Sequence, residues 1–229
     1  MLEKRTLEYP DNEAADGMAY SELHDVIDRY VAGLKTAGIQ KQDAVCLFLA
    51  SKSVHATALG LAILRLGATY IPLSSTLPDE RLGTQCRALG KAVKLLLYGD
   101  EEIDRVRAEA LASTLRVPVG SIGRVWSEYR NISDHSSWDG LALFLFTSGS
   151  AGTPKATGYR HRHLVSALEA CTATSVNTTS SETTTRTCNV APWVRDVASL
   201  DLFGPFLCDG AGSFAHQEQA ITQTIVEKE

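Results

Sequence analysis

Residues 44–73, AVCLFLASKSVHATALGLAILRLGATYIPL, contain two short apolar runs on either side of a longer apolar segment. The first run, residues 44–50, is nearly unbroken, as expected of a strand buried on both faces of a sheet. Residues 54–66 predict a buried helix, which Gly67 ends. Residues 68–73 predict a second strand, which we expect to stop at Pro72 because proline cannot donate a backbone hydrogen bond to a sheet. A strand, a helix and a strand in this order predict two parallel strands.

The same alternation extends on both sides of this stretch. Upstream, apolar residues recur at three- and four-residue spacing over residues 20–34, which predicts an amphipathic helix that Ser21 caps and Gly38 ends. Downstream, helices and strands alternate. The patterns predict helices over residues 78–89, 100–114 and 161–173, and strands over residues 92–98, 141–150 and 188–194. We therefore expect an α/β fold with a mainly parallel sheet flanked by helices.

Length and composition narrow the class of protein. A chain of 229 residues can form one sizeable α/β domain or two small ones. Its hydrophobic content of 44% and charged content of 21% are ordinary for a globular protein. A net charge of −5 argues against a nucleic-acid partner, which would usually require a basic face. Because no apolar run reaches the roughly 18 residues of a membrane helix, no membrane association is expected.

The cysteines and the first residues predict a cytoplasmic protein. Residues 1–17 are charged from the start and lack the apolar core of a signal peptide. The five cysteines lie far apart and are odd in number, which favours reduced thiols: Cys46, Cys86, Cys171, Cys188 and Cys208.

The stretch FTSGSAGTPKA, residues 146–156, has the composition of a phosphate-binding loop. Glycines let the backbone approach a ligand closely, hydroxyls donate hydrogen bonds, and a lysine supplies positive charge. The spacing fits neither GxxxxGK[ST] nor GxGxxG, so the loop is neither a Walker loop nor a dinucleotide fingerprint. By composition alone, a plain flexible turn of small polar residues is an equal alternative.

The order of residues in this loop closely resembles the phosphate-loop signature of the adenylate-forming superfamily, Y/F-T-S-G-S/T-T-G-x-P-K-G. Acyl-CoA synthetases, luciferases and the adenylation domains of non-ribosomal peptide synthetases belong to that superfamily. Residues 18–49, residues 59–82 and the HRHL stretch at His161 resemble further family segments in the same order. The similarity is nearest to peptide-synthetase adenylation domains and covers about residues 20–212. It implies the fold of the first sub-domain of the family's large N-terminal domain.

The resemblance implies an enzyme that activates a carboxylic or amino acid with ATP. The acid attacks the α-phosphate to give an acyl adenylate and pyrophosphate, and a thiol then accepts the acyl group. That thiol would be carrier-bound phosphopantetheine or coenzyme A. The loop would hold the β- and γ-phosphates together with Mg²⁺, through Thr147, Ser148, Gly149, Ser150, Gly152, Thr153 and Lys155. Asp196 would pair with the α-ammonium of an amino-acid substrate, although a solvated aspartate at a helix start is the alternative. The sequence assigns no catalytic residue and no protein ligand to a metal.

The sequence also departs from the family pattern. Ala151 and Ala156 replace a threonine and a glycine of the signature, and Arg195 and Ala198 replace residues around Asp196. The 229 residues contain no N-x-Y-G-P-T-E segment, no T-G-D aspartate for the ribose, no hinge and no second, catalytic lysine. The chain alone is therefore expected to lack catalytic competence, and a complementary chain or domain would supply the missing groups.

These observations predict three regions. Residues 1–18 form an N-terminal extension, and residues 213–229 form a polar tail. Residues 19–212 form a partial adenylation domain with a Ser/Thr-rich loop at residues 172–187, where eleven of sixteen residues are serine or threonine. The alternative function is a truncated, non-catalytic fragment that binds phosphate or nucleotide weakly or pairs with a partner. An unrelated α/β phosphate-binding protein is a further alternative.

Overall fold

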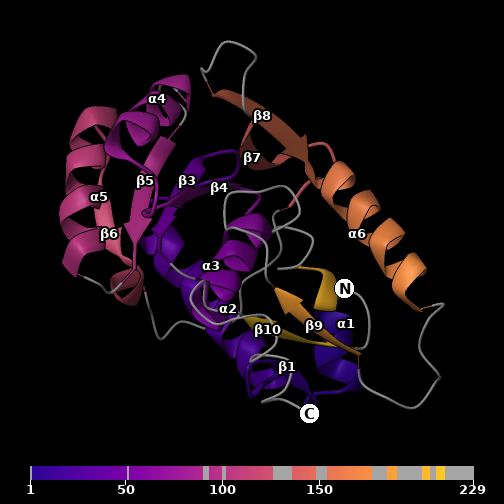
Figure 1. The fold of residues 1–229 in the computed structure, drawn as a ribbon. Helices are drawn as coiled ribbons and strands as arrows, with labels where there is room; N and C mark the ends of the chain where they lie inside the picture. The colour runs from indigo at the N-terminus through magenta and orange to yellow at the C-terminus, as the bar shows by residue number, and fades with distance from the viewer. Residues whose placement is uncertain are drawn as a thin grey trace. The chain divides into compact units, whose positions relative to one another are not determined.

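The computed structural model describes residues 2–50, 52–89, 93–99, 102–125, 136–147, 154–176, 185–189, 203–206 and 210–214. The chain forms two compact units, each with its own sheet (Figure 1). The six-stranded unit consists of Ile27–Ala50 and Leu59–Arg162. The four-stranded unit consists of Met1–Val26, Ser51–Ala58 and His163–Glu229.

The sheet of the six-stranded unit has the strand order β6-β5-β3-β4-β7-β8. All neighbours pair in parallel except β8, which is antiparallel to β7. The mainly parallel sheet predicted from the sequence is therefore confirmed, whereas β8 was not predicted. In chain order the strands are β3 (Ala44–Leu49), β4 (Thr69–Ser74), β5 (Val93–Tyr98), β6 (Val119–Ser121), β7 (Leu141–Thr147) and β8 (Lys155–Arg160).

Every residue of β3 and β4 is buried, so protein covers both faces of these central strands. On one face, side chains of β3, β4 and β5 form a hydrophobic cluster with side chains of α4 (Asp79–Leu89) and α5 (Glu102–Leu115). Phe48, Ile71 and Leu96 are completely buried in it. Each such side chain contributes about 1.5–3 kcal/mol relative to an exposed one. Figure 1 shows α4 and α5 beside β5 and β6.

The two helices upstream of β3 and β4 end in the same way. α2 (Tyr20–Thr36) is followed by Gly38 at a φ of 82°, and α3 (Val54–Arg65) by Gly67 at a φ of 68°. The amide N–H of each glycine and of the next residue donate to carbonyls of the last turn, at 2.9 to 3.1 Å. This is the Schellman arrangement, in which a left-handed residue ends the helix. The helix ends predicted at both glycines are confirmed.

The predicted start of α2 is partly wrong. The helix begins at Tyr20, so Ser21 lies inside its first turn rather than at the cap. Instead, the Glu22 carboxylate accepts a hydrogen bond from the Ala19 N–H at 2.9 Å. A glutamate three residues after the cap position supplies half of a capping box, and this signal was present in the sequence.

The expectation that Pro72 ends its strand is also wrong. β4 continues through Pro72 to Ser74, and Pro72 lies opposite Leu47 of β3. β4 pairs with β3 along its whole length but with β7 only between Tyr70 and Leu143. Because the ladder with β7 is this sparse, β4 does not have to bond fully on both sides and can contain a residue without an N–H.

The four-stranded unit joins segments from both ends of the chain. Its sheet has the order β2-β1-β10-β9, with β1 and β9 both parallel to β10 and β2 antiparallel to β1. A short helix precedes the sheet, and the Tyr20 and Phe206 rings meet edge to face at 6.4 Å between centroids. The elements are α1 (Leu2–Glu8), β1 (Glu13–Ala15), β2 (Met18–Ala19), β9 (Thr185–Asn189) and β10 (Gly210–Phe214).

This unit differs from the regions expected at both ends of the chain. Residues 1–18 contribute β1, which pairs through Ala15 with Gly212 of β10, so this segment belongs to a sheet. α6 (His161–Val176) continues into the range 172–187, and β9 begins before that range ends. Helix and strand thus occupy both ends of the predicted Ser/Thr-rich loop. The strand predicted at 188–194 begins earlier, at residue 185, and residues 190–194 lie outside the described residues.

Candidate functional site

The predicted phosphate loop connects β7 to β8. Thr147 is the last residue of β7, Lys155 is the first residue of β8, and the two are paired across the hairpin. The Thr147 Oγ1 donates to the Lys155 carbonyl oxygen at 3.5 Å, and both residues are exposed. Folding therefore places the two ends of the predicted loop side by side, with a hydroxyl-bearing and an ammonium-bearing residue facing solvent.

The other predicted site residues lie outside the described residues, and their roles stay predictions. They are Ser148, Gly149, Ser150, Gly152, Thr153 and Asp196.

The hairpin begins at the edge of the sheet where ligands of parallel sheets bind. Strands β3 to β7 run in one direction, so their carboxyl ends lie along the same edge. Ligands of open α/β sheets bind beyond this edge. Thr147 is the carboxyl end of β7, and the neighbouring strand β4 ends at Ser74. The sequence predicted that the loop emerges at the carboxyl ends of the strands, and the position of Thr147 agrees with this prediction.

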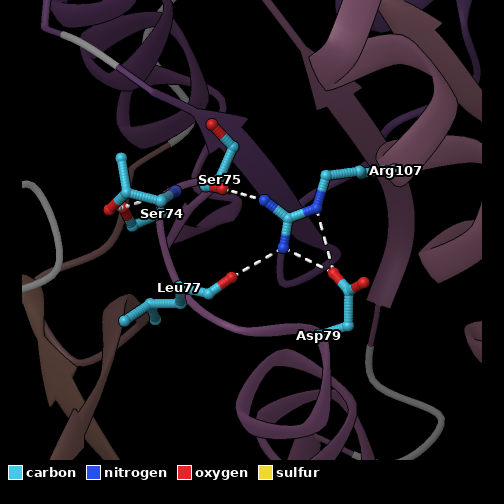
Figure 2. A network of polar contacts seen from close by, with 6 residues as sticks. Ser74, Ser75, Leu77, Asp79 and Arg107 are labelled. Atoms are coloured by element: carbon cyan, nitrogen blue, oxygen red, sulfur yellow. Dashed lines mark hydrogen bonds and ion pairs between the residues drawn. The ribbon is translucent and has the colours of Figure 1, made fainter.

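An arginine from α5 fixes the segment that follows β4 at this edge (Figure 2). The Arg107 guanidinium donates to the carbonyl oxygens of Ser75 and Leu77, the latter at 2.6 Å. It also contacts the Asp79 carboxylate through Nε at 2.9 Å and Nη2 at 2.5 Å. The guanidinium carbon also lies 5.8 Å from the centroid of the Phe48 ring. One side chain thus joins α5 to the connection between β4 and α4.

No local signal in the sequence marks this role for Arg107. The pattern of α5 contains several charged residues, and Arg105, two positions earlier, pairs with Glu109 on the helix surface. What distinguishes Arg107 is its contact with carbonyl groups about thirty residues earlier in the chain. Such a contact depends on the packing of α5 against the sheet.

The sequence of residues 2–229 matches the family model described as AMP-binding enzyme. The chain belongs to the AMP-binding enzyme family. This match covers nearly the whole chain and agrees with the resemblance found in the loop and its flanking segments. Each helix and strand that the sequence predicted between residues 20 and 173 has a counterpart in this AMP-binding protein, in the predicted order.

The AMP-binding chain is similar to non-ribosomal peptide synthetases. It is 29% identical over 182 residues to nonribosomal peptide synthetase agiA of Aspergillus flavus, covering 74% of this chain and 2% of the synthetase. It is 32% identical over 187 residues to nonribosomal peptide synthetase fmqA of Aspergillus fumigatus, covering 79% of this chain and 5% of the synthetase. The chain therefore spans only a small share of the length of these curated relatives.

Solved structures share the fold. The N-terminal subdomain of Klebsiella oxytoca NpsA, in complex with 3-hydroxyanthranilyl-AMSN, superimposes with a TM-score of 0.77 at 20% identity, over 99% of this chain and 55% of that one. The o-succinylbenzoate coenzyme A synthetase of Bacillus subtilis, in complex with ATP and magnesium ion, superimposes with a TM-score of 0.79 at 17% identity, over 99% and 59%. The fold is thus that of an adenylate-forming N-terminal subdomain, and the chain spans somewhat more than half of each structure.

Lys155 and Thr147 are the predicted phosphate-binding residues of the loop that the structure describes. Lys155 carries an exposed ammonium group, whereas the single hydroxyl proton of Thr147 is donated to the Lys155 carbonyl oxygen. Within the described ranges, no group of three or more His, Cys, Asp or Glu side chains is placed to hold a metal. In this same part of the chain, no helix combines the length and the hydropathy needed to cross a membrane.

Proposed function

We propose that the loop between β7 and β8 binds the β- and γ-phosphates of ATP, in a protein that activates a carboxylic or amino acid as its adenylate. The observation that carries this proposal is the pairing of Thr147 with Lys155 at the carboxyl edge of the sheet, in a chain of the AMP-binding family. The similarity to non-ribosomal peptide synthetases supports an amino-acid-like substrate.

Each loop residue has a role in this proposal. The Lys155 ammonium neutralises phosphate charge, and the hydroxyls of Ser148, Ser150 and Thr153 donate to phosphate oxygens. The Thr147 hydroxyl joins them by exchanging its hydrogen bond to the Lys155 carbonyl for one to phosphate. Gly149 and Gly152 allow the backbone to approach the phosphates. Bound Mg²⁺ would share the phosphate charge while pyrophosphate leaves. Asp196 would pair with the substrate's α-ammonium group.

The acceptor in the second step would be a thiol, either carrier-bound phosphopantetheine or coenzyme A. The adenine, ribose and catalytic-lysine segments of the family have no counterpart in the 229 residues. We therefore propose that this chain binds nucleotide without catalysing adenylation by itself, and that a complementary domain or chain completes the site. The free thiols of Cys46 and Cys86 support a cytoplasmic location.

Binding of ATP with Mg²⁺ to the 229-residue chain tests the phosphate site. Calorimetric titration of the Lys155→Ala variant should show an affinity lower by roughly 10- to 100-fold, because a hydrogen bond to a charged group contributes about 1.5–3 kcal/mol. Lys94→Ala is the matched control, since Lys94 is an exposed lysine on β5 of the same sheet. Equal affinities of Lys155→Ala and the unmodified chain would contradict the proposed role of the loop.

ATP–pyrophosphate exchange tests the proposed lack of catalysis. With a mixture of amino and aryl acids, the chain alone should give no substrate-dependent exchange. Exchange above background that disappears in Lys155→Ala would show that the 229 residues are active by themselves.

A further inference from the structure

The β7–β8 hairpin is fastened at the end opposite to the loop. The chain enters β7 through a turn closed by a hydrogen bond from the Gly140 N–H to the carbonyl three residues earlier, at 2.8 Å. It leaves β8 directly into α6. The N–H groups of His161 and Arg162 donate to the carbonyls of Gly140 and Trp138, at 3.0 and 3.1 Å. These carbonyls satisfy two of the amide donors that the first turn of a helix leaves without helical partners.

Side chains reinforce the same junction. The Arg160 guanidinium donates to the carbonyl oxygen of Asp139, and the Arg162 guanidinium donates to the Asp139 carboxylate. Three consecutive residues, 160–162, thus contact three consecutive residues, 138–140. We call this set of six residues the base clamp.

Two features within the hairpin define its register. The pairing shifts by one residue between Leu141 and Leu143, next to the base clamp. Further along, Phe144 lies opposite Gly158, where an added Cβ would stand 2.9 Å from the Phe144 ring. A larger residue at position 158 would force the Phe144 ring to shift. A slip by one residue would place the larger Thr157 or Tyr159 side chain opposite Phe144.

Register decides where the loop lysine lies. Side chains alternate between the two faces of a strand, so a slip by one residue moves each of them to the opposite face. Lys155 and Arg160 are the two ends of β8. Because the register shift at Leu141–Leu143 lies between these two ends, a contact that holds Arg160 and its neighbours against residues 138–140 fixes the face from which Lys155 projects by keeping this shift in place.

We propose that Asp139, through Arg160 and Arg162, is a positioning residue for Lys155: the base clamp fixes the register of β8 and thereby presents the lysine to a phosphate ligand. This inference rests on the proposed function, since it assigns a remote set of residues to the same phosphate site.

Binding of ATP with Mg²⁺ to Asp139→Ala tests the inference. Its affinity should fall about three- to fivefold, the upper range for the loss of one exposed ion pair. Charge alone predicts the opposite result, because removing a carboxylate should strengthen the binding of an anionic ligand. A loss of affinity for ATP therefore distinguishes the positioning role from a simple charge effect. In a Lys155→Ala background, Asp139→Ala should cause no further loss, since the clamp acts through that lysine.

The matched control is Asp28→Ala. Asp28 of α2 forms an ion pair with Arg65 of α3 at 2.5 Å in the same unit, and both side chains are more buried than those of the Asp139–Arg162 pair. Asp28→Ala should lower the free energy of unfolding without changing affinity for ATP. If it weakens binding as much as Asp139→Ala does, a general loss of stability explains both results and the inference is overturned.

Amide hydrogen exchange separates this inference from the proposed function. In Asp139→Ala, the amides of residues 155–160 should exchange several-fold faster, while those of α4 keep their rates. If the unmodified chain does not bind ATP, the proposed phosphate site fails, and faster exchange in β8 still supports the clamp. Unchanged exchange in β8, unchanged affinity, or a loss of affinity that persists without Lys155 would each overturn the positioning role.

Discussion

Gly33 of α2 lies directly against the backbone carbonyl of Val125. A Cβ built on Gly33 would stand 1.5 Å from the Val125 oxygen and 2.5 Å from its carbonyl carbon. Val125 ends the short 3₁₀ helix Ile122–Val125 that follows β6. Because the obstructing atoms belong to the backbone, no rotamer change can make room, and only glycine allows this approach.

The first prediction concerns this contact. Gly33→Ala should lower the free energy of unfolding by about 2–4 kcal/mol, since overpacking outweighs the gain of about 1 kcal/mol in helix propensity. Urea unfolding measures this change in the free energy of unfolding. Gly83→Ala in α4 is the control, because the nearest atom to its added Cβ is a flexible Arg87 nitrogen at 3.5 Å. That variant should be stabilised by about 0.5–1 kcal/mol, and equal effects of the two substitutions would refute the close approach.

The second prediction concerns the end of α5. Arg116 stands at the position after the helix with a φ of 58°, and the next residue donates to Ala112 in a Schellman-type bond at 3.1 Å. A residue with a Cβ is strained in this conformation. Arg116→Gly should therefore raise the free energy of unfolding by about 1 kcal/mol, and with it the melting temperature. The converse change, Gly38→Ala after α2, should destabilise by a similar amount, since Gly38 has the same conformation and no neighbouring atom near its added Cβ. A destabilised Arg116→Gly would contradict the prediction.

The third prediction concerns the arginine at the carboxyl edge. Arg107→Ala removes the donors to the Ser75 and Leu77 carbonyls and should cost about 1–3 kcal/mol in urea unfolding. Arg107→Lys should recover little, because an ammonium cannot reproduce the planar set of donors. Arg105→Ala on the same helix removes the exposed pair with Glu109 and should change stability by less than about 0.5 kcal/mol. A loss in Arg105→Ala as large as in Arg107→Ala would contradict this assignment.

The fourth prediction concerns pH. Burial raises the pKa of the Cys86 thiol to about 11, from an ordinary value of 9.0, and Arg87 opposes this only in part. The folded state therefore holds a proton that the unfolded state releases above pH 9. The contribution of this thiol to stability should be constant below about pH 9 and fall between pH 9 and pH 11, by up to about 3 kcal/mol. Cys46 and Tyr70, whose pKa values burial also raises, should extend the loss to higher pH.

Cys86→Ala isolates the contribution of one thiol. The variant should be less stable at neutral pH because it leaves a small cavity, but its stability should fall less steeply between pH 9 and pH 11. Urea unfolding at a series of pH values measures both slopes. Parallel pH profiles for the variant and the unmodified chain would show that Cys86 does not titrate as its burial implies.

Local pattern was sufficient for the central strands and their helices. The apolar runs that became β3 and β5 and the helical spacing of α2 predicted these elements to within a few residues. The glycines that end α2 and α3 were also recognisable, because a left-handed residue at a helix end has a strong preference for glycine. For the candidate site, the motif predicted a loop at residues 146–156 that includes Thr147 and Lys155, and the structure showed that these two residues end β7 and begin β8.

Pairing between distant segments was not predictable in this way. β1 is three residues long and finds its partner in β10 almost two hundred residues later, so no local periodicity marks either strand. β8 has little apolar alternation and is a strand because β7 lies beside it.

The sequence by itself determined the parallel α/β order, the helix ends at glycine, and a phosphate-loop motif between two particular residues. These features depend on hydrophobic periodicity, on backbone preference and on the identity of neighbouring residues. Only the tertiary structure decided that Pro72 stays within β4, that Arg107 holds the segment after β4, and that residues 138–140 fasten the base of the loop hairpin. Each of these depends on which backbone donors and acceptors meet after packing, and residues far apart in the chain acquire such partners only in the folded state.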